Sequence, residues 1–241
     1  MLPYALKQFT DDNDLTRAAA EAWLDETQIA SRDGQLFRVA LSGGRIARKF
    51  YASTVALATE RQQSLAHVHF FWADERCLAP TDPESNYRLA NDLMFVPLGV
   101  SRANIHRIRG EAAPEIAAAE ASTEICGIGP LNQDGLPVID LVILGLGEDG
   151  HVASLFPNAD KEVTDSRQAY VSVADSPKPP AARVTLSYAA IAAARLVWVL
   201  ASGQGKADAL RKSLSLKGST PLARVLESRQ QSWLLSDISA C

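Results

Sequence analysis

Short apolar runs alternate with longer amphipathic stretches along most of this chain, and this alternation is the feature that most constrains its fold. The runs have the length of strands, and several are apolar without interruption, as strands covered on both faces are. The amphipathic stretches have the length of helices, and such an alternation is typical of parallel strands joined by crossover helices. The sequence therefore predicts an α/β fold. The expected strands are Leu36–Leu41, His67–Trp72, Ile139–Leu144, Ala169–Val173, Arg183–Leu186, Leu196–Ala201 and Ser232–Leu235. The expected helices are Asp14–Ser31, Arg45–Glu60, Glu84–Met94, Ala113–Cys126 and Gln204–Leu216.

No stretch of the 241 residues has the composition of a linker between domains. Gly127–Pro137 is rich in Gly, Pro, Asn and Asp, and Ser176–Pro180 carries three prolines, so both segments are expected to be loops. With 47% hydrophobic residues the chain can bury a sizeable core, which excludes a disordered chain. We expect residues 1–241 to form a single domain.

Charge and cysteine content exclude several classes of protein. The net charge is -4 without a basic block, which argues against capture of nucleic acid or of an anionic membrane. The longest apolar stretch, Tyr188–Ala201, is interrupted by Arg195 and is shorter than the roughly 20 residues that cross a bilayer. The three cysteines show no metal or disulfide spacing, and the N-terminus lacks the pattern of a secretion signal. We expect a cytoplasmic protein that is a monomer or a weak homodimer.

The segment Ser42-Gly43-Gly44-Arg45 follows the first strong strand and opens a helix. Two adjacent glycines let the backbone approach a ligand closely, and the free N–H groups of a helix start point at an anion bound there. A phosphate is the natural candidate. A tight strand-to-helix turn would also explain the two glycines, so the motif alone leaves both interpretations open.

The strongest feature is the apolar strand that ends in Gly145-Leu146-Gly147-Glu148-Asp149-Gly150-His151. This turn delivers Asp149 and His151 to the carboxyl edge of the sheet, where open α/β folds bind their ligands. An imidazole has the unperturbed pKa nearest physiological pH, as a group that removes a proton from water needs. A histidine in a turn is often structural, but its position after three glycines favours catalysis. His151 is therefore the candidate general base.

The three glycines also match the spacing of a dinucleotide-binding fingerprint. That fingerprint needs a βαβ unit and an acidic residue roughly 20 positions on, at the end of the second strand. Here Pro157 cuts any helix short, and the nearby acidic residues come before the next strand. These departures disfavour a nicotinamide enzyme.

Four charged residues elsewhere could add to an anion site. Arg76 offers a fork of donors suited to a phosphate, and Asp74 can accept from a sugar hydroxyl or from a catalytic group. Arg183 opens a short strand and Lys206 begins a helix, so each could add positive charge. A surface ion-pair cluster would explain Asp74 and Arg76 equally well. A lone Arg or Lys at the positions of Arg183 and Lys206 is more often simply solvated.

The sequence contains neither a Gly-x-Ser-x-Gly elbow nor a cluster of metal ligands, so it predicts attack by water with the help of a base. Hydrolysis of a lactone suits that set of groups. A lactone is already electrophilic and needs only a positioned water and stabilisation of the developing charge.

Several blocks between Leu41 and Lys206 occur together in the order of a known family. They resemble the 6-phosphogluconolactonases of the short bacterial and eukaryotic type, within the wider group that includes glucosamine-6-phosphate deaminases. The long block around His151 is the most specific. The blocks are Leu41-Ser42-Gly43-Gly44, Trp72-Ala73-Asp74-Glu75-Arg76 with Ser85-Asn86, Leu144 to Pro157, Arg183-Val184-Thr185-Leu186 and Gly205-Lys206.

The resemblance implies a Rossmann-like, mostly parallel sheet with helices on both faces, and an enzyme without cofactor or metal. It implies hydrolysis of 6-phospho-D-glucono-1,5-lactone to 6-phosphogluconate in the pentose phosphate pathway. His151 would deprotonate the water, and Asp74 would lie near the sugar or the base. The residues expected to bind the substrate and its phosphate are Ser42, Gly43, Gly44, Arg45, Arg76, Asn86, Arg183 and Lys206.

The chain departs from the family pattern at two places. After the paired glycines it carries Arg45-Ile46-Ala47 where a hydroxyl residue and Pro are usual, so a hydroxyl donor is lost and the role of Arg45 stays open. Val152 stands where Thr is usual, which removes a possible hydrogen bond beside His151. Neither change removes a charged group from the expected site.

Two alternative functions remain. Deaminases of the wider group carry a glutamate five residues after the histidine and Tyr after Asp-Glu, whereas this chain has Phe156 and Arg76 at those positions. A non-catalytic sugar-phosphate sensor would usually carry a DNA-binding segment, and nothing before Leu36 resembles a basic recognition helix. Both comparisons favour the lactonase.

Overall fold

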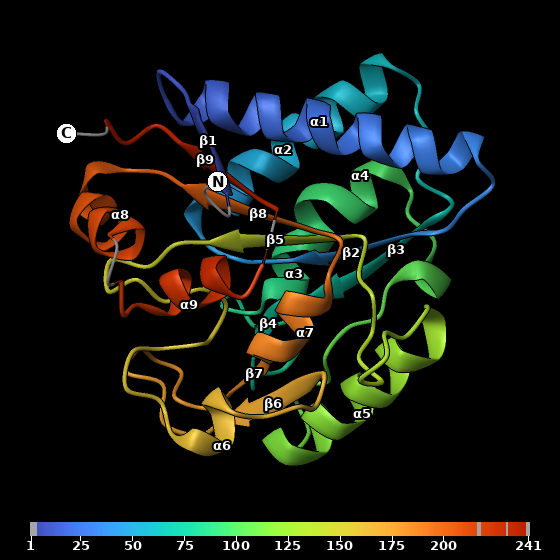
Figure 1. Cartoon of the computed structure of the whole chain (residues 1–241). Coiled ribbons are helices and arrows are strands. Elements are labelled where there is room, and N and C mark those ends of the chain that lie inside the picture. The colour runs from blue at the N-terminus through green and yellow to red at the C-terminus, as the bar shows by residue number, and fades with distance from the viewer. Residues whose placement is uncertain (1–3, 216–217, 230, 240–241) are drawn as a thin grey trace.

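A six-stranded parallel sheet forms the centre of the structure (Figure 1), a computed structural model that describes residues 4–215, 218–229 and 231–239. Its strands lie in the order β1-β9-β8-β5-β2-β3, and all neighbouring pairs are parallel. The central strands are buried, which explains why their sequences are continuous apolar runs. The strands are β1 Tyr4–Gln8, β2 Phe37–Leu41, β3 Val68–Trp72, β5 Leu141–Gly145, β8 Leu196–Ala201 and β9 Ser232–Ser236.

Helices cover both faces of this sheet, as the resemblance implied (Figure 1). Helices α1 and α2 lie on one face, and α7 and α9 lie on the other. Trp23 of α1 is fully buried and packs against Phe50 of α2 and Phe70 of β3, which fastens the first pair of helices to the sheet. Each helix in the described ranges is too short or too polar to span a bilayer. These helices are α1 Asp12–Arg32, α2 Arg45–Glu60, α7 Tyr188–Ala193 and α9 Pro221–Glu227.

A second, antiparallel sheet of three strands packs below the main sheet (Figure 1). Its strands are β4 (Asp74–Arg76), β7 (Arg183–Leu186) and β6 (Tyr170–Val173), and α5 (Pro114–Ile128) packs against the last two. The sequence predicted β6 and β7 as strands, but it did not predict β4 or the antiparallel pairing. The register sets Asp74 opposite Thr185 and Arg76 opposite Arg183, so this small sheet brings two predicted site segments together.

The helix predicted at Glu84–Met94 has other bounds in the structure. It begins at Asn86, because the Ser85 side chain caps it by accepting from the Arg88 N–H, and it runs through a π-helical turn to Leu98. The predicted helix Gln204–Leu216 is a 3-10 turn (Gln204–Lys206) followed by α8 (Ala207–Leu214), and its predicted end lies outside the described residues. Short elements were missed because they hold too few residues to show a period. They are β1, β4, α6 (Lys161–Thr164), α7 and α9.

The chain leaves β2 and β5 in opposite directions across the sheet. Helix α2 carries the chain from β2 to β3 on one side, whereas the segment after β5 leads to β8 on the other. Because β2 and β5 are neighbours, their carboxyl ends define a switch point of the topology. Open α/β sheets bind ligands in the crevice at such a point.

Candidate active site

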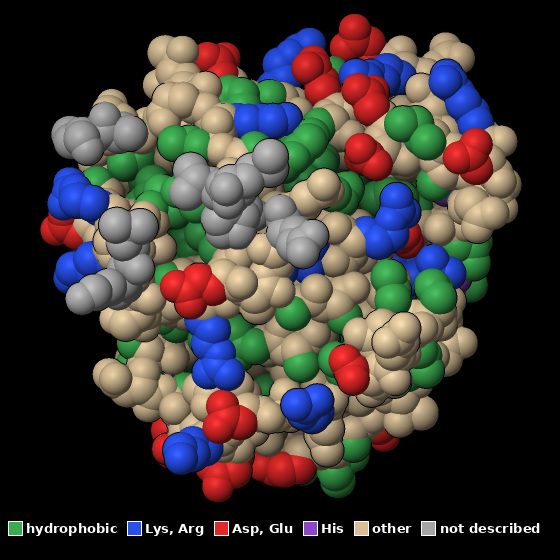
Figure 2. All heavy atoms as spheres, in the orientation of Figure 1, with side chains coloured by type: hydrophobic (Ala, Val, Ile, Leu, Met, Phe, Trp, Pro, Cys, Tyr) green, Lys and Arg blue, Asp and Glu red, His purple; other side chains and the backbone are tan. Residues whose placement is uncertain are grey.

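A cleft of about 410 Å³ lies at this carboxyl edge, and all ten residues predicted for the site line it. The face in Figure 2 carries basic and acidic side chains side by side, whereas the cleft is lined by five cations and two carboxylates. Such a cleft favours a small anion. The ten predicted residues are Ser42, Gly43, Gly44, Arg45, Asp74, Arg76, Asn86, His151, Arg183 and Lys206, and Glu148 and Lys178 are among the further lining residues.

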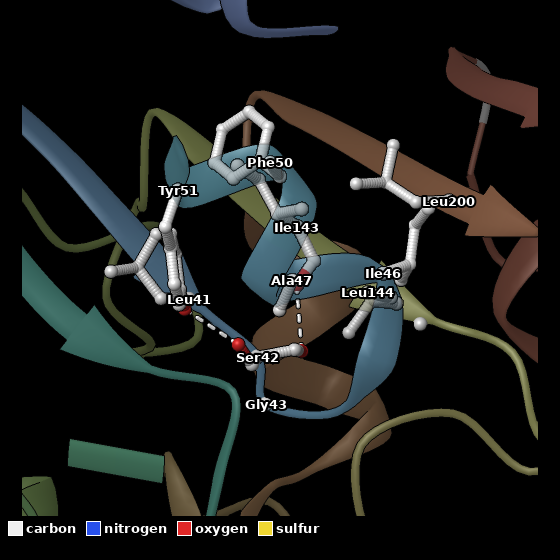
Figure 3. Close-up of a pocket in the computed structure, with 11 residues that line it drawn as sticks. Leu41, Ser42, Gly43, Ile46, Ala47, Phe50, Tyr51, Ile143, Leu144 and Leu200 are labelled. Carbon is white, nitrogen blue, oxygen red and sulfur yellow. Dashed lines mark hydrogen bonds between the residues drawn. The ribbon is translucent and has the colours of Figure 1, made fainter. Parts of the chain in front are cut away.

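The turn from β2 into α2 presents backbone N–H groups to the cleft. Gly44 has a φ of 91°, a conformation that favours glycine, and no side chain caps the helix, so its first N–H groups have no side-chain acceptor. Figure 3 shows what anchors the turn from behind. The Ser42 hydroxyl donates to the Ile143 carbonyl of β5 at 2.7 Å, and the Tyr51 hydroxyl donates to the Ser42 carbonyl at 2.6 Å. The Ser42 hydroxyl is therefore occupied within the protein.

The His151 imidazole contacts the Asp149 carboxylate through Nδ1, within the turn that follows β5. Gly150 has a φ of 86°, and a Cβ at Gly147 would overlap the imidazole ring, so this turn requires glycine at both positions. An ionised carboxylate can only accept, so Nδ1 carries the proton and Nε2 keeps its lone pair. A general base needs this tautomer, because the lone pair of Nε2 is then free to take a proton from water.

The surroundings of His151 keep it neutral near physiological pH. Burial lowers the pKa of the imidazole, and the Asp149 carboxylate opposes that shift. Burial would raise the pKa of Asp149, but the hydrogen bond from His151 lowers it overall, so the carboxylate is ionised. The Phe156 ring packs beside the imidazole with 4.7 Å between ring centroids. An apolar wall thus lies at the position where deaminases carry a glutamate.

Asp74 is almost fully buried where it lines the cleft, and two neutral donors hold it. The Ser154 hydroxyl donates to Asp74 Oδ2 at 2.6 Å, and Asn86 Nδ2 donates to the Asp74 carbonyl and to Oδ1 at 2.9 and 3.3 Å. A Cβ at Gly43 would overlap the Asn86 amide, so the glycine turn and this network pack directly against each other. Asn86 therefore contacts both the glycine turn and Asp74.

Arg76 retains an unused donor. Its Nη1 donates to the Glu84 carbonyl at 2.6 Å, but its buried Nε has no hydrogen-bond partner among the described residues. An unpaired buried donor costs free energy unless a ligand or water satisfies it. Arg76 lines the cleft, so a bound ligand could supply an acceptor for this donor.

The other predicted cations differ in how they are held. Arg45 is mostly exposed and bridges Asp12 (3.1 Å) and the Ser202 carbonyl (3.1 Å). Burial and the neighbouring Arg45 charge lower the pKa of Lys206, and both cations line the cleft. Arg183 is buried, and most of its donors bond to backbone carbonyls of the loop before β7.

Three residues of the cleft region have no role predicted from the sequence. Asp149 is one of them, although a carboxylate two residues before a candidate base is a visible signal. Ser154 and Lys178 carried no such signal, because their partners lie far away in sequence or on a loop whose path is set by the fold. In the described ranges no cluster of three His, Cys, Asp or Glu side chains could hold a metal ion.

The fold and the cleft define an α/β protein with a mainly cationic cleft at the switch point of its sheet, and comparison with known proteins identifies its family. Residues 10–234 match the family of glucosamine-6-phosphate isomerases/6-phosphogluconolactonase, and the chain belongs to this family. It is 36% identical to a 6-phosphogluconolactonase of Treponema pallidum, over 83% of this chain and 82% of that protein. It is 33% identical to one of Streptomyces coelicolor, over 95% and 91%. A solved 6-phosphogluconolactonase of Trypanosoma brucei superimposes with a TM-score of 0.85 at 25% identity, over 98% and 97% of the two chains.

Proposed function

We propose that this protein hydrolyses 6-phospho-D-glucono-1,5-lactone to 6-phosphogluconate, a step of the pentose phosphate pathway, in the cytoplasm. The observation that carries the proposal is the pairing of His151 with Asp149 in a cationic cleft. The family of the chain and its lactonase relatives support the same reaction.

In the proposed reaction, His151 Nε2 removes a proton from water while the water oxygen attacks C1 of the lactone. The carbonyl oxygen becomes an oxyanion, and when it collapses the bond between C1 and the ring oxygen breaks. The ring oxygen takes the proton from His151 and becomes the C5 hydroxyl. C1 becomes a carboxylic acid, which ionises to the carboxylate and releases its proton to solvent. Asp149 acts as a positioning residue that holds the imidazole in the required tautomer.

The substrate's phosphate binds, in this proposal, at the opposite end of the cleft. The free N–H groups at the start of α2 and the charges of Arg45 and Lys206 meet there. Arg76 offers its unpaired Nε to the ligand from the second sheet. Asp74 accepts from a sugar hydroxyl, since Ser154 and Asn86 leave it buried and fixed in orientation.

The nature of residue 156 favours the lactonase over a deaminase. Ring opening of an amino sugar needs a second acid or base beside the histidine, and here the neighbouring position presents the apolar Phe156 ring. Hydrolysis of a lactone needs a single base, because the carbonyl is already activated.

The test is a coupled assay with freshly prepared 6-phosphoglucono-δ-lactone, in which reduction of a nicotinamide cofactor reports 6-phosphogluconate. Spontaneous opening of the lactone is subtracted, and glucosamine 6-phosphate is assayed for ammonia release in parallel. We expect enzyme-dependent lactone hydrolysis and no ammonia. Ammonia release without lactone hydrolysis would reject the proposal in favour of a deaminase, and inactivity on both substrates would favour a sensor.

A further inference from the structure

The loop that joins β6 to β7 brings to the cleft a cation that has no role in the reaction as described so far. Lys178 and Pro179 of this loop line the cleft together with His151 and Arg183. Lys178 is exposed, and no carboxylate of the described residues lies within ion-pair distance of it. Its ammonium is therefore available to a ligand.

The loop has a defined shape. The Ser176 hydroxyl donates to the Lys178 carbonyl at 2.9 Å and accepts from the Lys178 N–H at 3.2 Å. The Ser176 N–H donates to the Ala181 carbonyl at 3.0 Å, which closes the loop on itself. These bonds hold the backbone from which the Lys178 side chain extends.

Arg183 fastens the same loop to the second sheet. Its Nη2 donates to the Lys178 and Pro179 carbonyls at 3.0 and 3.2 Å, and its Nε donates to the Pro180 carbonyl at 3.1 Å. A further contact joins Nη1 to the Ser154 hydroxyl at 3.5 Å. A guanidinium has five N–H donors, so Arg183 uses most of them inside the protein rather than on a ligand.

The Lys178 charge acts on two other groups that line the cleft. Burial is the main cause of the lowered pKa of His151 and of Lys206, and the Lys178 ammonium lowers the pKa of each of them further. Lys178 lines the same cleft as His151 and Lys206, so its charge acts on the proposed base and on the proposed phosphate site. Arg45, Lys206 and the start of α2 are assigned to the phosphate. The Arg183 guanidinium lies over the Phe156 ring, which packs beside His151, but most of its donors bond to loop carbonyls. Lys178 is therefore the cation of this loop whose donors are available to a ligand.

We propose that Lys178 is a further catalytic residue, which binds the C1 carbonyl oxygen of the lactone, and that Arg183 is the positioning residue that holds its loop. This inference rests on the proposed lactonase function. Attack of water on C1 places a negative charge on that oxygen, and a cation beside the base stabilises it. The same oxygen becomes part of the product carboxylate, so Lys178 also binds the product.

The test compares two ligands that differ at C1. The product 6-phosphogluconate carries a phosphate and a carboxylate, whereas glucitol 6-phosphate carries only the phosphate. We expect Lys178→Met to weaken binding of 6-phosphogluconate about tenfold or more, as loss of a charge-assisted hydrogen bond does. Calorimetry should give an unchanged Kd for glucitol 6-phosphate. In the lactone assay kcat should fall on the order of 100-fold with little change in KM.

The control is Lys161→Met, which removes an exposed lysine of α6 away from the cleft and should leave both dissociation constants unchanged. Equal weakening of both ligands by Lys178→Met would make Lys178 a phosphate anchor, and no weakening of either would remove it from the site. Each of these results overturns the proposal. A wild-type protein inactive on the lactone would instead reject the proposed function, a separate outcome.

A double-mutant cycle tests the role of Arg183. If Arg183 acts through the loop, Arg183→Lys weakens 6-phosphogluconate binding in the wild type but adds little in the Lys178→Met background. Fully additive losses would mean that Arg183 contacts the ligand itself, and would overturn its assignment as a positioning residue. Thermal unfolding of each variant checks that the loss of affinity comes from a folded protein.

Discussion

Asp149 and His151 lie two residues apart in one glycine-rich turn, and the carboxylate of the first contacts Nδ1 of the second. The backbone, rather than a distant segment, thus brings the two groups together. Gly147 and Gly150 permit this geometry, because a side chain at the first would overlap the imidazole and the second adopts a positive φ. Gly147 and Gly150 therefore make room for the imidazole and allow the turn that carries it. Their resemblance to a dinucleotide fingerprint is limited to the spacing.

The Asp149→Asn variant tests that relationship. The amide no longer fixes the productive tautomer, so we expect kcat to fall roughly 10²- to 10⁴-fold. Asp149 opposes the effect of burial on the pKa of His151, so without it that pKa falls further and the acid limb of kcat/KM moves to lower pH. Rates measured from about pH 5 to about pH 8 check this. An acid limb that stays in place would mean that His151 is not the titrating group.

Gly43→Ala tests the contact between the phosphate-binding turn and the second sheet. The added methyl group would overlap the Asn86 amide, which must then leave Asp74. We expect a loss of lactone hydrolysis of about tenfold or more, since the network that fixes Asp74 is broken. Gly127→Ala in α5 is the matched control, because nothing lies within 4 Å of its new methyl group. Equal activity of the two variants would contradict the close packing of Gly43 on Asn86.

Arg76→Ala tests the unpaired donor. A phosphate anchor supplies mainly uniform binding, so we expect KM to rise about tenfold or more with a smaller change in kcat. Arg61→Ala, which removes a solvent-facing ion pair with Asp25, serves as the control and should leave both constants unchanged. An unchanged KM in Arg76→Ala would show that the buried Nε does not meet the substrate.

The buried strands and long amphipathic helices could be predicted from the sequence to within a few residues. β7, β8 and α2 have the predicted bounds, because burial on both faces or a steady helical period marks them clearly. The glycine turns and their charged residues could also be predicted, since position after a parallel strand determines where a side chain emerges. The order of the strands, in which β2 and β5 are neighbours, brings these residues into one cleft.

The contacts that hold the site in shape could not be predicted. The Ser154 hydroxyl donates to Asp74, which lies 80 residues away in the sequence. Strand β4 pairs with β7, and no local sequence pattern predicts this pairing. Arg183 is the clearest case. Its position at the start of a strand suggested added positive charge at an anion site, whereas most of its donors bond to carbonyls of the preceding loop.

Glu75 provides a test of stability that is independent of catalysis. Burial raises the pKa of its carboxyl from 4.5 to about 7, although three backbone N–H groups oppose that shift. Between pH 4.5 and about pH 7 the Glu75 carboxyl therefore keeps its proton in the folded protein and loses it in the unfolded chain. This contribution to stability is complete below the unfolded pKa and is lost as the pH rises through the folded pKa.

Urea unfolding of wild type and Glu75→Gln at several pH values measures this contribution. We expect the advantage of the wild type to shrink as the pH rises from about 5 to about 8. Glu60→Gln, at an exposed helix end, should show no such trend. A difference in unfolding free energy that grows with pH would contradict the raised pKa of Glu75.

The most direct test of the account is the rate of enzyme-dependent lactone hydrolysis in His151→Ala, with spontaneous opening subtracted. Loss of a general base predicts a decrease in kcat of about 100-fold or more. His106→Ala, a histidine that contacts His69 and Glu124 outside the cleft, should retain the wild-type rate. A folded His151→Ala protein that hydrolyses the lactone as fast as the wild type would contradict the claim that this imidazole activates water.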